Sequence, residues 1–316
     1  MQYSTYNRLK EKAILHKACL LCGSTRTFLA SAYSADSIVE RWRNEYGIDV
    51  RQYFGGHVDV LSWKCRSCGL RFFDSCMGGD SELYTQLQHH EMYYLNEKWE
   101  FHMARRFIPL DARLLEVGCG TGSFLMGLSQ GAKVQACGIE MNPEAVIAAQ
   151  SKGLNVELAD LTQIATARAG VYDVVCHFQV LEHVSNPCSF LRQCVDLLKP
   201  GGLLIVAVPN GGGFLKYEKA QLLNMPPHHL SIFHERTMRV VGHMLGLRVK
   251  RIIAEPLSDE HLKWFSDLQI DRIPRIPYVT WPFISPLRTS LPWVIKTLRL
   301  QRLIKGHNLF AVYQKI

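Results

Sequence analysis

The sequence contains no long apolar run, although 47% of its 316 residues are hydrophobic. A membrane-spanning helix needs at least roughly 18 consecutive apolar residues, and no stretch approaches that length, so we expect no transmembrane segment. The N-terminus is polar and charged through Lys12 and lacks the apolar core of a secretory signal. There is also no internal repeat and no low-complexity tract. Length and apolar content instead predict one large folded domain and one small one.

Acidic residues are the rarer charged class, with 28 Asp and Glu against 36 Lys and Arg, which gives a net charge of +8. Such an excess is compatible with nucleic acid, an anionic membrane surface, or phosphorylated and nucleotide-linked substrates. The basic residues are spread along the chain and cluster only near the C-terminus. The plainest interpretation is a solvated surface, and nucleic acid is an allowed but not a favoured partner.

The glycine spacing at residues 114–122, Leu-Leu-Glu-Val-Gly-Cys-Gly-Thr-Gly, is not the G-x-G-x-x-G of a dinucleotide site. An apolar stretch ending in an acidic residue runs into three alternating glycines, which is typical of a buried strand, a tight turn and a helix. Glycine allows positive φ angles and close approach of a ligand to the backbone. The helix that follows offers unpaired N–H groups to a polar ligand. Taken alone, the pattern also fits a turn without a ligand.

Strand-like and helix-like segments alternate after the glycine pattern. Apolar runs predict strands at residues 134–139, 156–159, 172–178, 203–208, 248–253 and 308–314. Asn142 and Pro143 fit the N-cap and first position of one helix, and another helix is expected at about 186–198. This alternation predicts an α/β fold with a doubly wound, mostly parallel sheet.

The order of these segments, together with the stretches VLEHVSNP, LLKPGGLLIVAVPN and PPHHLSIF, resembles the class I S-adenosylmethionine-dependent methyltransferases. The resemblance covers residues 113–253 and points to the subgroup that includes small-molecule methyltransferases of ubiquinone and natural-product pathways. It implies a Rossmann-like, seven-stranded methyltransferase sheet with 248–253 and 308–314 as an antiparallel pair at its edge. It also implies S-adenosyl-L-methionine as cofactor.

The cofactor-binding residues follow from the same resemblance. The three glycines would line the methionine moiety, and Glu140 would hold the ribose. Met141 would pack on the adenine, Asp160 would lie near its amino group, and Phe178 and Gln179 would lie near the sulfonium. Cys119 reads as a small filler within the loop. The expected set is Glu116, Gly118, Cys119, Gly120, Gly122, Glu140, Met141, Asp160, Phe178 and Gln179.

Two C-x-x-C motifs, each followed by glycine, place Cys19, Cys22, Cys65 and Cys68 near the N-terminus. Four thiolates on two tight turns can converge on a structural zinc ion, whereas a single motif would also fit a redox site. Because 42 residues separate the motifs, residues 31–60 must form an inserted lobe. Some sugar and polysaccharide-pathway methyltransferases resemble this arrangement. A zinc site with reduced thiols elsewhere predicts a cytoplasmic protein.

The expected catalytic residues are Glu182 and His183, after the strand at 172–178, and His228 and His229, after Pro226-Pro227. Methyl transfer is mainly a positioning problem, with a base needed where the acceptor loses a proton. Glu182 and His183 also fit a purely structural role. The chain lacks a catalytic metal pattern such as H-E-x-x-H, so the sequence predicts no catalytic metal.

We divide the chain into a zinc-ribbon-like domain (1–79), a helical linker or lid (80–108) and a methyltransferase domain (109–316) with an insert at about 255–306. Tyr93 and Tyr94 in the linker are candidates for cofactor contact or for ordinary packing. The insert is expected to cover the substrate. Residues 291–305 predict a basic amphipathic helix with Pro292 in its first turn, which packs on the domain or contacts an anionic membrane weakly.

The sequence therefore favours methyl transfer to a small polar acceptor, such as a sugar, a nucleotide-sugar or another metabolite of glycan or secondary metabolism. An RNA methyltransferase is the alternative, since a zinc ribbon and a basic charge would serve it. The chain lacks the Asn-Pro-Pro-Tyr type of motif that resembled enzymes use on base amino groups. A non-catalytic cofactor-binding protein is a third reading. The oligomeric state stays open.

Overall fold

A seven-stranded sheet forms the centre of the computed structural model, which describes residues 17–88, 97–129, 133–218, 221–273 and 281–316. The strand order is β10-β11-β8-β7-β4-β5-β6. Strands β4 to β8 run parallel, whereas β11 is antiparallel to both β8 and β10. The predicted α/β sheet with an antiparallel edge pair is thereby confirmed. The strands are β4 (Arg113–Val117), β5 (Gln135–Glu140), β6 (Val156–Leu158), β7 (Tyr172–Phe178), β8 (Leu198–Pro209), β10 (Leu247–Pro256) and β11 (Lys305–Lys315).

Helices cover both faces of this sheet, because neighbouring residues of its central strands point to opposite sides. Leu115 and Val175 lie in one core cluster, and Leu114 and Val174 lie in the other. The first cluster includes residues of α7 (Leu161–Ala167), α8 (Pro187–Asp196) and α9 (Glu235–Met244). The second includes residues of α4 (Trp99–Arg105), α5 (Ser123–Ser129) and α6 (Pro143–Gln150). The buried sheet therefore explains why its strands are nearly continuous apolar runs.

The cap predicted at Asn142 is present in the structure. Asn142 precedes α6 and accepts a hydrogen bond from the Glu144 backbone N–H, and Pro143 occupies the first turn. Asn186 caps α8 in the same way, by accepting from Ser189. Both helices start directly after loops at the carboxyl ends of strands, so the caps fix where those loops end.

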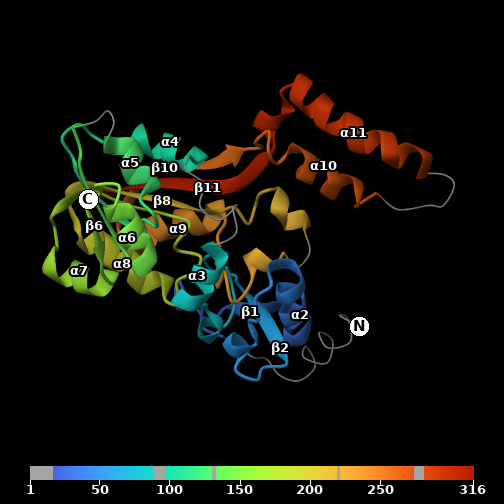
Figure 1. The fold of residues 1–316 in the computed structure, drawn as a ribbon, viewed down its shortest axis with the longest axis horizontal. Coiled ribbons are helices and arrows are strands. Elements are labelled where there is room, and N and C mark those ends of the chain that lie inside the picture. Colours follow the sequence, from blue (N-terminus) through green and yellow to red (C-terminus); the bar gives the residue numbers. More distant parts are fainter. Residues whose placement is uncertain (1–16, 89–96, 130–132, 219–220, 274–280) are drawn as a thin grey trace.

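A second sheet organises the N-terminal lobe, which lies beside the larger sheet (Figure 1). Its order is β1-β2-β3-β9, with β1 (Thr27–Ser34), β2 (Asp59–Cys65), β3 (Arg71–Phe72) and β9 (Ser231–Ile232). Helix α2 (Ala35–Tyr46) and the 3-10 turn η1 (Arg51–Phe54) connect β1 to β2, where the sequence predicts an inserted lobe. The 3-10 turn η2 (Ser75–Met77) and helix α3 (Ser81–Gln88) follow β3. Because β9 comes from the chain after β8, one segment ties the lobe to the large sheet.

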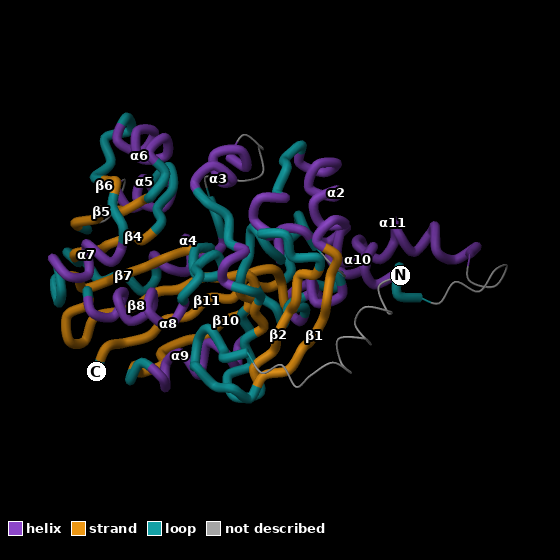
Figure 2. Tube along the Cα trace, turned by 90° about the horizontal axis from the view of Figure 1, so that it is seen from below, coloured by secondary structure: helices purple, strands orange, loops and turns teal. Residues whose placement is uncertain are grey.

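The insert after β10 projects from the body as a helical pair, visible in two views (Figures 1 and 2). It consists of α10 (Leu262–Ile270) and α11 (Trp281–Thr297), and Arg288 of α11 forms ion pairs of 2.7 and 2.5 Å with Asp267 and Asp271. The 3-10 turns η3 (Phe214–Tyr217), η4 (Leu222–Asn224) and η5 (Leu300–Leu303) complete the described elements. Within the described ranges, no helix has the length and apolarity to cross a membrane.

The predicted helix at 291–305 is wrong. Helix α11 ends at Thr297, Arg299 adopts a left-handed conformation with φ of 52°, and β11 begins at Lys305. Pro292 lies inside α11 rather than in its first turn. The apolar and basic residues of this stretch therefore do not form one continuous face. The aromatic candidates Tyr93 and Tyr94 lie outside the described residues.

Candidate functional site

The glycine loop follows β4 as predicted and adopts a conformation that side chains rarely allow. Gly118, Gly120 and Gly122 have φ angles of 71°, 53° and 78°. A Cβ atom on Gly118 would lie 2.7 Å from Val180 Cγ2, and one on Gly122 would lie 2.3 Å from Leu154 Cδ1. Only glycine combines these angles with such close neighbours. At its three glycines the loop therefore has no side chain between its backbone and this edge of the sheet.

Glu140, at the end of β5, holds the glycine loop from the neighbouring strand. One carboxylate oxygen accepts from the Gly120 N–H at 2.9 Å. The other accepts from the backbone N–H groups of Met141 and Asn142 at 2.8 and 2.9 Å. An ionised carboxylate has about four acceptor positions, so these three bonds leave it capacity for a ligand hydroxyl.

Glu116 is a buried carboxylate with an unsatisfied oxygen. Its side chain is almost fully inaccessible, and its Oε2 has no hydrogen-bond partner within the described part of the chain. Burial raises the pKa of Glu116 well above its usual range. An unpaired buried oxygen is costly, and it sits one strand residue before the glycine loop. A ligand ammonium or amine would satisfy it.

The remaining predicted cofactor residues lie around this loop with different exposures. Met141 is 66% exposed and so offers an apolar surface next to Glu140. Asp160 caps α7 by accepting from Thr162 N at 2.6 Å through one oxygen. Cys119 is buried, and its sulfur lies where a side chain on Gly138 would go, 2.6 Å from the ideal Cβ position. Burial raises the pKa of the Cys119 thiol, which fits a packing role.

Phe178 is the last residue of β7, and Gln179 follows it. Their side chains have different surroundings. Phe178 is buried in an aromatic group with Phe101 and Phe124, at centroid distances of 5.2 and 4.8 Å. Gln179 has a positive φ of 56°, and its side-chain amide donates to Glu100 Oε1 at 3.1 Å and to Asn308 Oδ1 at 3.2 Å. No sequence pattern indicated Glu100 and Asn308 as its partners, because they come from α4 and β11.

The four predicted catalytic residues converge in one buried cluster. The imidazole centroids of His183, His228 and His229 lie 4.4 to 4.7 Å apart. Glu182 Oε1 lies 3.9 Å from the Nε2 atoms of both His183 and His229. The two dipeptides are more than 40 residues apart in sequence. We name the group of Glu182, His183, His228 and His229 the histidine cluster.

Backbone hydrogen bonds explain why the two dipeptides meet. The Glu182 carbonyl accepts from the N–H groups of Leu230 and Ser231 at 2.8 and 3.1 Å. These bonds dock the start of β9 onto the loop after β7. Val180, two residues before Glu182, contacts the glycine loop at Gly118. The histidine cluster is therefore a neighbour of the predicted cofactor site.

Every cluster histidine has a hydrogen-bond partner at Nδ1. His183 Nδ1 lies 2.7 Å from the His228 carbonyl and 3.0 Å from the Tyr84 hydroxyl of α3. His228 Nδ1 lies 2.9 Å from the Leu223 carbonyl. His229 Nδ1 faces Asn224 Oδ1 at 3.1 Å. Sequence reasoning missed Asn224, whose position depends on the loop fold alone.

Burial sets the charge of the histidine cluster. It lowers the pKa of His183 to about 3, that of His228 to about 4 and that of His229 well below the usual value. It raises the pKa of Glu182 to about 8. Neither Glu182 oxygen has a hydrogen-bond partner within the described ranges. At neutral pH the rings are neutral bases, and the carboxyl group would gain strongly from a positively charged neighbour.

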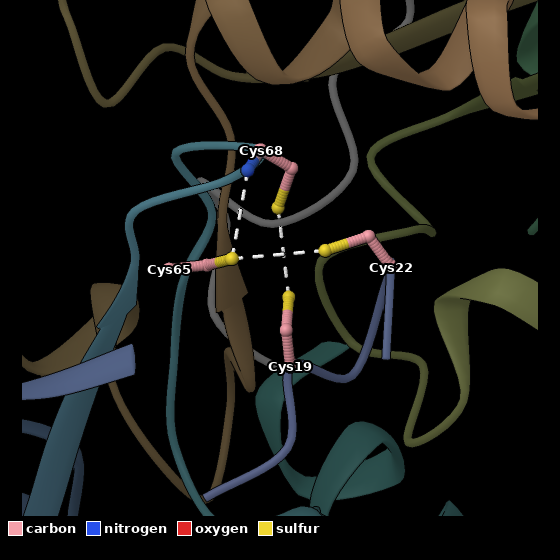
Figure 3. Close-up of side chains that lie close together, drawn as sticks. All are labelled: Cys19, Cys22, Cys65 and Cys68. Atoms are coloured by element: carbon pink, nitrogen blue, oxygen red, sulfur yellow. Dashed lines mark hydrogen bonds between the residues drawn. The ribbon is translucent and has the colours of Figure 1, made fainter. Parts of the chain in front are cut away.

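The four cysteines of the N-terminal lobe point toward one centre (Figure 3). Cys19 Sγ lies 3.5 Å from Cys68 Sγ, and Cys22 Sγ lies 3.6 Å from Cys65 Sγ. Four sulfurs at 2.3 Å from a tetrahedral zinc ion would be about 3.8 Å apart. The glycines after each motif, Gly23 and Gly69, have positive φ angles of 67° and 86° and close the two turns. The arrangement could hold zinc with little rearrangement.

Residues 87–252 match the family model described as a methyltransferase domain. Over 125 residues the chain is 37% identical to the ubiquinone biosynthesis O-methyltransferase of Parvibaculum lavamentivorans, covering 37% of this chain and 49% of that protein. Over 102 residues it is 44% identical to the enzyme of the same name from Ruegeria pomeroyi, covering 31% and 41%. The chain thus spans about half the length of these curated relatives or less.

A solved structure supports the fold. A SAM-dependent methyltransferase from Archaeoglobus fulgidus matches with a TM-score of 0.51 and 19% identity, over 73% of this chain and 100% of that one. At this identity the likeness concerns the fold alone. Since the family model covers more than half of the chain, this protein belongs to the methyltransferase-domain family.

Proposed function

We propose that the protein transfers a methyl group from S-adenosylmethionine to a hydroxyl of a small polar acceptor. The observation that carries this proposal is the pairing of an unsatisfied buried Glu116 oxygen with the glycine loop that Glu140 holds. Together they offer acceptors for an ammonium and a ribose hydroxyl, next to a loop that has no side chains at its three glycines. When bound, S-adenosylmethionine supplies an electrophilic methyl group at this edge of the sheet.

The chain's own residues position the reactants and receive a proton. Glu116 would accept from the cofactor's ammonium, and Glu140 would accept from its ribose. The acceptor oxygen would form a bond to the methyl carbon as the carbon–sulfur bond breaks, and the bonding electron pair would stay on sulfur. The hydroxyl proton would pass to the histidine cluster, in which Glu182 has the pKa nearest to neutrality, about 8. Tyr84 of α3 is hydrogen-bonded to His183. This contact makes α3 a candidate for part of the cover over the acceptor site.

The names of the relatives favour an oxygen acceptor on a small molecule, since both are ubiquinone biosynthesis O-methyltransferases. The surplus of basic residues would suit a phosphorylated or nucleotide-linked acceptor. We therefore place a sugar, a nucleotide-sugar or a related polar metabolite first. The insert α10–α11 is a candidate cover for it.

Methyl-labelled S-adenosylmethionine incubated with a fractionated metabolite extract tests this function. We expect label in a small-molecule fraction, and we expect Glu140→Ala to abolish cofactor binding measured by calorimetry. Glu144→Gln is the matched control, because Glu144 is a nearby exposed carboxylate on α6. Label in RNA with a steep salt dependence would favour the RNA alternative. Absence of both cofactor binding and labelled product would refute the proposal.

We also propose that Cys19, Cys22, Cys65 and Cys68 bind a structural zinc ion. Their sulfur separations support it, and a four-thiolate set leaves no open position for catalysis. The ion would join the turn before β1 to the turn between β2 and β3.

A further inference from the structure

The Nε2 nitrogens of the histidine cluster are hydrogen-bond acceptors. The His228 and Leu223 carbonyls can only accept, so His183 and His228 carry their protons on Nδ1. Asn224 donates its amide to Gln221 Oε1, which leaves Asn224 Oδ1 to accept from His229 Nδ1. A neutral ring protonated at Nδ1 carries a lone pair at Nε2. Metal-binding histidines are oriented by this kind of outer hydrogen bond.

Glu182 adds a carboxylate to these lone pairs. It is 1% exposed, and its Oε1 lies 3.9 Å from two of the Nε2 atoms. Its two oxygens lack a hydrogen-bond donor among the described residues. A buried group of bases and one carboxylate without a donor needs a proton or a metal cation at its centre.

The spacing of the cluster is close to that of a metal site. One ligand atom of each histidine can be chosen so that all three lie within 4.8 Å of one another. Ligands at about 2.1 Å from one ion are at most about 4.2 Å apart, so small ring rotations would close the set. We propose that His183, His228 and His229, with the Glu182 carboxyl group beside them, bind a divalent transition-metal ion, distinct from the zinc at the four cysteines.

The donor set narrows the class of ion. Three imidazole nitrogens suit zinc, iron(II) or cobalt(II), whereas magnesium and calcium prefer oxygen ligands. A divalent charge also satisfies the Glu182 carboxylate in a way that a neutral ligand could not. Unlike the four-thiolate set, three histidines resemble the ligands of open sites, which keep room for a further oxygen ligand.

The role that this ion would have in methyl transfer rests on the proposed function. The cluster adjoins the glycine loop through Val180 and Gly118, so an ion there would lie beside the cofactor site. Bound to the ion, the acceptor hydroxyl has a lowered pKa and loses its proton to solvent. The resulting oxygen then forms the bond to the methyl carbon, and proton uptake by the histidine cluster is no longer required.

Cobalt(II) titration of chelator-stripped protein tests the ion site without any substrate. We expect two ions per chain: one with the strong sulfur-to-cobalt charge-transfer absorption of a thiolate site, and one without it. In His229→Ala the second ion should bind at least about 100-fold more weakly, since even an outer partner changes metal affinity by 10–100-fold. Glu182→Gln should weaken it as well. His243→Ala, which removes an exposed histidine of α9, should leave both ions in place.

The outcome separates the two proposals. Uptake of only the thiolate-bound ion by the wild-type protein would overturn the metal site, and this count needs no variant. Unchanged second-ion affinity in both His229→Ala and Glu182→Gln would overturn it too, with circular dichroism confirming that the variants fold. Calorimetry of S-adenosylmethionine binding to the metal-free protein is read separately. If the protein binds the cofactor but no second ion, the proposed function stands and the metal site is rejected. If it binds a second ion but no cofactor, only the proposed function is rejected.

Discussion

The cysteine cluster and the histidine cluster each bring four ligand-type side chains together, but the chain builds them differently. Each pair of cysteines lies in one C-x-x-C turn that its own glycine closes. The histidine cluster joins two dipeptides through backbone bonds from Leu230 and Ser231 to the Glu182 carbonyl. The first cluster is encoded locally, whereas the second exists only after the large fold has formed. A four-residue site therefore need not be visible as a motif.

The largest effect should come from the cysteine cluster, because it helps to hold a lobe with a small core. Cys65→Ser removes one thiolate from a buried position. Structural zinc can contribute on the order of 10 kcal/mol to the folding of small metal domains, so we expect loss of bound zinc and unfolding of the N-terminal lobe. Atomic emission and thermal unfolding measure both.

Cys76→Ser is the matched control, since Cys76 is exposed and lies in the same lobe. It should keep one zinc per chain and the wild-type melting temperature. If Cys65→Ser also kept its zinc and its stability, the cysteines would not be a structural site.

Next in size is the effect of Glu182→Gln on turnover. The change keeps the shape of the side chain but removes the carboxylate that faces His183 and His229. We expect the methyl-transfer rate to fall by about 10²- to 10⁴-fold, with cofactor affinity unchanged because Glu182 lies outside the glycine loop. Glu157→Gln, on β6, should be silent. Wild-type kcat in Glu182→Gln would show that the cluster serves structure alone.

Local patterns account for what the sequence predicted well. The glycine loop, the cap at Asn142 and the two cysteine turns each depend on a few consecutive residues. The alternation of apolar runs was enough for the sheet, since buried parallel strands need continuous apolar sequence. These features require no knowledge of distant contacts.

Tertiary contacts account for what it missed. Nothing in the sequence around Asn224 indicates that its amide oxygen meets His229, and Glu100 reaches Gln179 from another helix. The H-E-x-x-H pattern describes a metal site on one helix. Its absence therefore says little about a site that two loops share. The predicted helix at 291–305 failed because Arg299 turns left-handed, which periodicity alone does not reveal.

A smaller effect is expected at the outer hydrogen bond of the histidine cluster. Asn224→Ala removes the acceptor that orients His229 but no ligand. We expect second-ion affinity for cobalt to fall by about 10- to 100-fold, with the thiolate-bound ion unaffected. Asn155→Ala, an exposed asparagine before β6, is the control. An unchanged affinity would mean that the ring is oriented by packing rather than by Asn224.

The smallest effect concerns His177, a histidine of β7 that lies outside the cluster. It is fully buried, neither ring nitrogen has a hydrogen-bond partner within the described ranges, and burial lowers its pKa to about 3. Below a pH of about 6.5 the unfolded chain takes up a proton that the folded protein refuses. Stability should therefore fall as the pH drops from 6.5 toward 3, by about 1.4 kcal/mol from this residue at pH 5.5.

His177→Phe removes the titrating group and keeps an aromatic ring beside Phe190. Denaturant unfolding at pH 7 and pH 5.5 should show a smaller acid-induced loss of stability in the variant, by about 1.4 kcal/mol, whatever its stability at pH 7. His243→Phe, at an exposed site of α9, should keep the wild-type difference. Equal losses in wild type and His177→Phe would mean that the folded protein accepts the proton. Burial alone would then be an insufficient reason for the histidine cluster to stay neutral.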